Sequence, residues 1–313
     1  MKRHFLTIAL ALMSLTLFAA NTTYLPISVY VGDLVEPFPE GAKALMESRL
    51  TQVLTKNGVA GMSYQGQFAL TVAAVPIDKD ILPGPPSKIS EKLEVNLFIV
   101  DVYNKTIFAS TSVTARGIGE NENKAYVDAI KRMPVQNKDI AAFVEEGKQK
   151  IVGYYDAKAE QMIQKARALA MQKDYGQALN IVSLIPEECK YYNDALAAGV
   201  EIYQQYLDNE CNINLAAARQ AWAAEQNSKG AQRAGEYLAN ILPDAACYGD
   251  AMELYSEIKG KVLDDWKFEM KIYQDGVDLE KERIKSMRDI GVAWGENQPR
   301  EIYHLDFLPH FRR

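Results

Sequence analysis

The residues before and after Pro134 follow different patterns, and this change constrains the fold more than any other feature of the chain. Before Pro134, short β-rich runs alternate with helical patterns. From Lys138 to about Asp289 there is hardly a β-like run, and Ala, Gln, Glu, Lys, Leu and Tyr dominate. A mixed segment followed by a purely helical one predicts an α+β domain and then an all-α antiparallel helical array.

The segment before Pro134 predicts the order strand, helix, strand, strand, strand, helix. The expected strands are residues 24–31, 68–75, 93–103 and 107–113, and the expected helices are residues 39–56 and 120–133. A short turn at Asn104-Lys105 joins the last two strands as a hairpin. We therefore expect a small, mostly antiparallel sheet with helices packed against it.

The segment after Pro134 predicts a series of helices with short loops, which makes neighbouring helices antiparallel. The expected helices are residues 138–153, 156–172, 175–185, 190–208, 213–227, 230–241 and 247–288. Residues 185–195 are weakly repeated at 242–251, which indicates stacked helix–turn–helix units, although shared helix-start chemistry also accounts for the similarity. Residues 291–313 have no helical pattern and are expected either to pack back as an extended strand or to hang free.

The amino terminus has the parts of a secretory signal peptide. Lys2 and Arg3 precede an apolar run, and Ala19-Ala20 follows it, so cleavage is expected near Ala20. An uncleaved anchor is the alternative, because a large residue stands three positions before the cut. The expected organisation is residues 1–20 as signal peptide, 21–134 as α+β domain, 135–290 as helical domain and 291–313 as irregular tail.

Loss of the signal peptide makes the chain more acidic. Removing Lys2 and Arg3 changes the formal net charge from −6 to −8, because two positive charges leave. Such a chain has no electrostatic reason to bind nucleic acid and no polybasic patch for anionic lipid. No later stretch is long and apolar enough to span a bilayer, so we expect a periplasmic protein with at most peripheral membrane association.

The cysteines, Cys189, Cys211 and Cys247, are odd in number and leave one thiol over after a bridge. An oxidising compartment favours a disulfide. If helix 190–208 is straight, Cys189 and Cys211 lie at opposite ends, about 30 Å apart, whereas a bridge needs Cα atoms within about 7 Å. Two further reversals return Cys247 to the end where Cys211 lies. We therefore predict a Cys211–Cys247 disulfide with Cys189 unpaired; three buried, reduced thiols are the alternative.

The sequence offers no catalytic, cofactor or metal site. Gly117-x-Gly119 lacks the third glycine of a dinucleotide fingerprint, and we expect it to turn the chain from strand into helix. His304, Asp306 and His310 have no strong ligand spacing. The scarcity of histidine also disfavours nucleophile–base schemes, which need a base in hydrogen-bond range. The prediction is a protein that is not an enzyme and holds no cofactor.

A set of tyrosines recurs in the helical half and suggests either a recognition surface or ordinary helix packing. Its members are Tyr154, Tyr155, Tyr175, Tyr191, Tyr192, Tyr203 and Tyr206. Tyrosine supplies contact area with little loss of entropy, so we name the first five as candidate partner-binding residues.

Two stretches resemble known families. Leu97 to Ala129 has a strand ending in Val-Asp-Val, a return strand, Gly-x-Gly and an Ala-containing helix. This pattern is similar to a superfamily of envelope domains that includes the curli secretion-channel lipoprotein, the lipoprotein activators of penicillin-binding proteins, the flagellar outer-membrane lipoproteins and the amino-terminal domain of the Tol-system propeller protein. Residues 173–179 resemble the first turns of tetratricopeptide-like helices. The chain departs from most of those lipoproteins because it lacks an acylated cysteine.

Both resemblances imply assembly or partner binding in the periplasm. The expected function is therefore an exported envelope protein that acts through a protein partner. One alternative is a ligand-binding envelope protein with a pocket at the junction near Pro134 to Asp156. A second is a periplasmic hydrolase with a carboxylate pair that the sequence does not reveal.

Overall fold

The computed structural model describes residues 23–32, 38–39, 41–273 and 278–309, so the expected signal peptide and its cleavage at Ala20 lie outside the described residues. The described elements are, in chain order, β1 (Thr23–Tyr24), β2 (Ile27–Val29), α1 (Ala42–Lys56), β3 (Val59–Ala60), β4 (Phe68–Leu82), β5 (Lys88–Asp101), β6 (Thr106–Gly119), α2 (Glu122–Arg132), α3 (Lys138–Met171), α4 (Tyr175–Ser183), α5 (Tyr192–Ala224), α6 (Ser228–Leu238), α7 (Tyr248–Val262), a 3-10 turn (Leu263–Asp265) and α8 (Leu279–Glu296). The predicted fold class, α+β followed by all-α, is confirmed.

The main sheet has the strand order β2-β4-β5-β6. β4, β5 and β6 are antiparallel neighbours, and β2 adds to β4 in parallel. The two-residue strands β1 and β3 form a separate parallel pair. The sheet is thus mostly antiparallel, as its short connecting turns predict.

Both faces of the sheet are covered near the end of β5, which explains why residues 97–100 are apolar on both sides. Leu97 and Ile99 belong to the large core that the helices complete, and Ile99 packs directly on Gly147 of α3. Phe98 and Val100 point to the opposite face, where a small second core includes Leu305. The expected irregular tail therefore packs back on the sheet, but without forming a strand. We name residues 297–309 the C-terminal strap.

Two predicted helix breaks are wrong, because α3 runs unbroken through residues 154–155 and α5 runs unbroken through residues 209–212. In α5, the Asn212 and Asn214 amides each donate to the main-chain oxygen four residues earlier, at 2.8 Å. Asn side chains usually favour helix ends, but here their amide groups find hydrogen-bond acceptors within the same helix.

The predicted long helix 247–288 is also wrong. α7 ends at Val262, and Leu263 takes a positive φ of 49°, which an α-helix does not allow. Trp266 and Phe268 then pack on Tyr255 of α7, with ring centroids 5.4 and 6.0 Å away. The chain resumes as α8, which continues to Glu296, inside the segment expected to be irregular.

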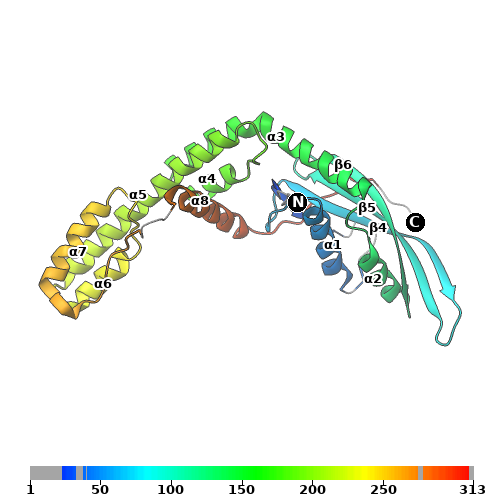
Figure 1. The fold of residues 1–313 in the computed structure, drawn as a ribbon, viewed down its shortest axis with the longest axis horizontal. Helices are drawn as coiled ribbons and strands as arrows, with labels where there is room; N and C mark the ends of the chain where they lie inside the picture. Colours follow the sequence, from blue (N-terminus) through cyan, green and yellow to red (C-terminus); the bar gives the residue numbers. More distant parts are fainter. Residues whose placement is uncertain (1–22, 33–37, 40, 274–277, 310–313) are drawn as a thin grey trace, which may run out of the picture.

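The molecule is bent, with a sheet arm and a helical arm (Figure 1). α3 lies along the outer side of the bend and α8 along the inner side, while α5, α6 and α7 form the helical arm (Figure 1). α3 contacts β6 as well as α4 and α5, so one continuous helix belongs to both arms. Among the described residues, no helix has the length and apolar character to cross a membrane.

Candidate functional site

The structure distributes the candidate tyrosines over separate packing clusters. Tyr154 and Tyr155 pack edge-on against Phe68 of the sheet, with centroids 5.2 and 6.0 Å away, and Tyr155 is 2% exposed. Tyr175 packs against Tyr206 at 5.8 Å. These contacts are those of ordinary helix and sheet packing, the alternative that the sequence left open.

The last two candidate tyrosines lie beside charged groups. Tyr191 lies 4.9 Å below the Lys190 ammonium, and the Tyr192 hydroxyl lies 2.5 Å from Nη2 of Arg288. Neither is fully buried. A role of the five tyrosines in partner binding stays a prediction.

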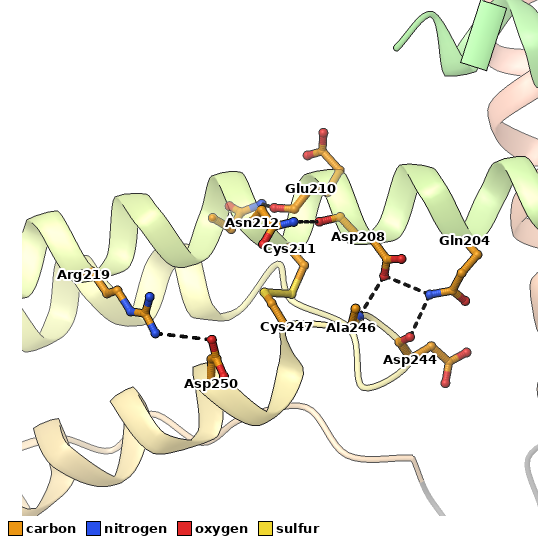
Figure 2. The surroundings of a disulfide bond; sticks show 11 residues. Gln204, Asp208, Glu210, Cys211, Asn212, Arg219, Asp244, Ala246, Cys247 and Asp250 are labelled. Atoms are coloured by element: carbon orange, nitrogen blue, oxygen red, sulfur yellow. Dashed lines mark hydrogen bonds and ion pairs between the residues drawn. A yellow bond between two sulfur atoms is a disulfide. The ribbon is translucent and has the colours of Figure 1, made fainter. Parts of the chain in front are cut away.

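A disulfide joins Cys211 to Cys247, with Cα atoms 6.0 Å apart, and Cys189 is a buried thiol outside the bridge. The pairing agrees with the prediction, but its geometry differs. Because α5 is continuous, Cys211 lies within the helix rather than at its end, and the single reversal through α6 brings Cys247 beside it (Figure 2).

Asp208 ties the same loop to α5. Its Oδ1 accepts from the Ala246 amide at 2.8 Å and from Nε2 of Gln204 at 3.0 Å (Figure 2). Gln204 also donates to the main-chain oxygen of Asp244 at 2.9 Å. The disulfide and these hydrogen bonds hold the loop before α7 against α5, and we assign them a structural role.

Gly117 and Gly119 lie within β6 and do not form the predicted turn. A Cβ on Gly117 would meet the backbone of Ala125 and Ala129, and one on Gly119 would meet that of Lys124 and Ala125. The glycines therefore let α2 lie directly on the strand. The expectation that they carry no ligand-binding role stays a prediction.

The weak metal candidate gains no support from its described residues. Asp306 pairs with the Lys105 ammonium at 3.0 Å, and His310 lies outside the described residues. Within the part of the chain that the structure describes, no three His, Cys, Asp or Glu side chains are grouped to hold a metal ion.

The outer edge of β6 is an unpaired strand edge among the described residues. β6 is the last strand of the order, and no strand among the described residues pairs with its outer side. Its 14 residues, TIFASTSVTARGIG, include one charged side chain, Arg116, and no proline. Proteins usually protect such an edge with charges, prolines or bulges, because unpaired N–H and C=O groups invite another strand.

The opposite edge carries that protection. Beyond its pairing with β2, the outer half of β4 contains Pro76, Asp78, Lys79 and Asp80, and a register shift lies between Pro76 and Asp78. This outer half of β4 continues into the β4–β5 hairpin, which projects from the end of the sheet arm (Figure 1). One edge is thus blocked and the other is open.

The only charge on β6 is neutralised within the sheet. Arg116 reaches across β5, where Nη1 donates to Oγ of Ser90 at 3.0 Å, and binds Asp78 and Asp80 on β4 at 2.5 and 3.0 Å. The hydrogen bonds that Arg116 donates to Asp78 and then to Asp80 raise its pKa above the usual value. The exposed edge therefore presents little net charge to an approaching strand.

Near the end of β6, a side chain of α2 binds a backbone amide of the edge, and this bond shows which amides of β6 point outward. The Ile118 amide donates to Oδ2 of Asp128 on α2 at 2.9 Å, and this bond is the main cause of the lowered pKa of Asp128. The Ile118 amide therefore points outward, and the regular register places those of Ser110, Ser112 and Thr114 on the same side. Their side chains are exposed. Strand order decides which strand lies at the edge of the sheet, and no local sequence pattern reveals that β6 is the last strand.

Two cavities lie near the bend. A groove of about 670 Å³ runs between α1 and residues 60–65, with Arg300 of the strap at its rim. A smaller cavity of about 200 Å³ lies between Tyr24 of β1 and helices α4, α5 and α8. Neither takes a lining residue from Pro134 to Asp156, where a ligand pocket was expected.

Comparison with known proteins gives little further guidance. No family model and no curated protein match this chain. A minor lipoprotein from Acinetobacter baumannii is 19% identical over 42% of this chain and 95% of its own length, with a TM-score of 0.24. A putative lipoprotein from Caulobacter crescentus is 11% identical over 43% of this chain and 91% of its own length, with a TM-score of 0.21. Likeness at these TM-scores carries no argument about fold or function.

Proposed function

We propose that this chain is an exported envelope protein that binds a partner protein by adding the partner's strand to the outer edge of β6. The asymmetry of the sheet edges carries the proposal: the β4 edge is blocked by Pro76 and charges, while β6 is long, nearly uncharged and open. Export is supported by the signal-peptide pattern of residues 1–20 and by the Cys211–Cys247 disulfide, which belongs to oxidising compartments.

The partner is an extended peptide segment rather than a helix. Main-chain hydrogen bonds from Ser110, Ser112 and Thr114 supply affinity in strand addition, and alternate side chains supply specificity. The exposed hydroxyls of these residues favour Ser, Thr or β-branched side chains opposite them, because such cross-strand pairs each contribute roughly 0.2–1 kcal/mol.

Site-specific photo-crosslinking in the cells that produce the protein tests this proposal. A photoreactive side chain at Thr114 is expected to capture one defined protein, whereas the same group at Asp80, on the blocked edge, captures none. Adding Ser112→Pro removes an outward amide without touching the β5 pairing, since proline is tolerated where the N–H faces solvent. That change is expected to abolish the crosslink.

Ser112→Ala is the matched control, because it keeps the amide and should keep the crosslink. A crosslink of equal yield in the Ser112→Pro protein, with an unchanged melting temperature, would show that the partner does not bind as a strand at this edge.

A further inference from the structure

A small cavity lies where the two arms of the molecule meet. Its walls come from Tyr24 of β1, from Val182 and Ser183 of α4, and from helices α5 and α8. Its volume is about 200 Å³. A dry apolar cavity of about 150 Å³ is sufficient to bind benzene, so this one has room for a single ring or a branched aliphatic chain.

The interior of the cavity is apolar. The residues that form it share branched or thioether side chains: Val182, Ile185, Leu196, Met287 and Val292. Val182, Ile185 and Met287 are almost fully buried, with 2–4% exposure. An apolar group that enters this space loses contact with water, which is the main source of affinity in small-molecule pockets.

The rim carries one positive and one negative side chain that are weakly joined. Nη2 of Arg288 lies 3.7 Å from Oε1 of Glu187, and their side chains are 43% and 64% exposed. The Tyr192 hydroxyl lies between them, 2.5 Å from Arg288 and 3.4 Å from Glu187. A pair this long and exposed holds itself together weakly, so a ligand with stronger hydrogen bonds displaces it at little cost.

Two hydroxyl groups add to the polar side of the cavity. Oγ of Ser183 is buried and has no hydrogen-bond partner. Tyr24 has its pKa raised to about 12, chiefly by burial, while Arg288 acts in the opposite direction. Both hydroxyls are therefore neutral groups in the wall of the cavity.

We propose that this cavity binds a free apolar α-amino acid as its zwitterion. The side chain enters the apolar space, the carboxylate binds the Arg288 guanidinium, and the α-ammonium binds the Glu187 carboxylate. The rim is neutral overall and presents both signs side by side, so it complements a zwitterion better than a simple acid or amine. The Tyr24 hydroxyl, which also lines the cavity, supplies a further hydrogen bond to the carboxylate.

Calorimetric titration of the mature chain tests the proposal with three probes that share one ring. L-Phenylalanine has both charges, 3-phenylpropanoate lacks the ammonium, and phenethylamine lacks the carboxylate. Phenylalanine is expected to bind, and each of the other two to bind roughly tenfold or more weakly, because each loses a charge-assisted hydrogen bond.

Variants at the rim give changes of opposite sign that misfolding does not produce. Glu187→Gln is expected to weaken phenylalanine binding and to strengthen binding of 3-phenylpropanoate, because it removes a repulsive charge. Arg288→Gln should weaken phenylalanine binding and strengthen phenethylamine binding, because it removes a positive charge that repels the ammonium. Lys285→Gln, on the same helix but outside the cavity, should change none of the three affinities.

Absence of heat with phenylalanine would overturn the proposal. So would equal affinities for the three probes, or a Glu187→Gln protein that loses phenylalanine and 3-phenylpropanoate alike.

Discussion

At the residue scale, Gly117 is essential for a reason that its sequence context does not suggest. The Gly-x-Gly pattern predicts a turn, but the glycine lies in a strand under the backbone of α2. The space for a side chain is taken by a helix packed through Ala125 and Ala129, which are both fully buried. Only the tertiary contact reveals this requirement, so sequence reasoning found the right residue and the wrong cause.

Replacing Gly117 by alanine is therefore expected to lower the free energy of unfolding by about 1–3 kcal/mol or more, because the new methyl group forces α2 off the strand. Gly153 of α3 is the matched control, since nothing lies within 4 Å of its potential Cβ. Gly153→Ala should raise stability by roughly 0.5–1 kcal/mol, the usual gain from alanine in a helix. Urea unfolding of the two variants measures both, and a stable Gly117→Ala protein would contradict the packing argument.

Glu91 makes stability depend on pH. It is 6% exposed, its Oε2 has no hydrogen-bond partner, and burial and then the Glu122 charge raise its pKa, with Lys79 opposing. The pKa of this carboxyl is near 4.5 in the unfolded chain and higher in the folded protein. The folded state therefore loses stability as the pH rises from the unfolded pKa to the folded pKa.

Glu91→Gln is expected to raise the melting temperature at pH 7 and to leave it unchanged below about pH 3, where both states are protonated. Thermal melts across this range give the comparison, with the exposed Glu146→Gln as control. An equal shift at both pH values would mean that the amide changes packing rather than charge.

At the element scale, helix continuity was the least predictable property of the chain. Residues 209–212 were predicted as a break because Asn side chains compete with the helical backbone, yet α5 passes through them. α6 and the disulfide loop pack along this stretch, and tertiary contact overrides local propensity. The pairing of Cys211 with Cys247 was nevertheless predicted correctly, although the argument placed Cys211 at a helix end and counted two reversals where the structure has one.

The disulfide is expected to stabilise mainly the helical arm. It closes a loop of 36 residues, for which restriction of the unfolded chain gives roughly 4 kcal/mol. Cys211→Ser with Cys247→Ser should therefore increase hydrogen exchange in α6 and α7 while the amides of β5 keep their protection. Cys189→Ala, which leaves the bridge intact, should show neither effect. Faster exchange across the whole sheet would mean that the two arms unfold as one unit.

At the scale of the whole molecule, the fold class followed from the sequence, while the return of the strap did not. The double-sided apolar pattern of residues 97–100 required a cover over Phe98 and Val100 on the second face, but no local pattern identifies Tyr303 and Leu305 as that cover. Tyr303 reaches Gly66 across a sequence separation of 237, with its hydroxyl 2.6 Å from the main-chain oxygen. Contacts of this range depend on the path of every helix between them.

Within the strap, the contribution of a side chain should follow its burial. Leu305 is 6% exposed, so Leu305→Ala should lower the free energy of unfolding by about 2–5 kcal/mol. Ile302→Ala, at a site 78% exposed, should stay within about 0.5 kcal/mol of the unchanged protein. Equilibrium unfolding tests both, and an equal response would mean that the strap does not hold the sheet in solution.

The return of the strap joins the stability of the sheet to that of the helical arm through loop-closure entropy. While α4 to α8 are folded, residue 297 is held beside the sheet, so seating the strap closes only a short loop. Once these helices unfold, binding of the strap to the sheet must close a flexible loop of roughly 130 residues, at an entropic cost of about 4 kcal/mol. The far arm thus acts as a rigid spacer that keeps the local concentration of the strap high. Unfolding of the helical arm therefore destabilises the sheet by lengthening the flexible loop before the strap, and no chain of side-chain contacts between the arm and the sheet is needed.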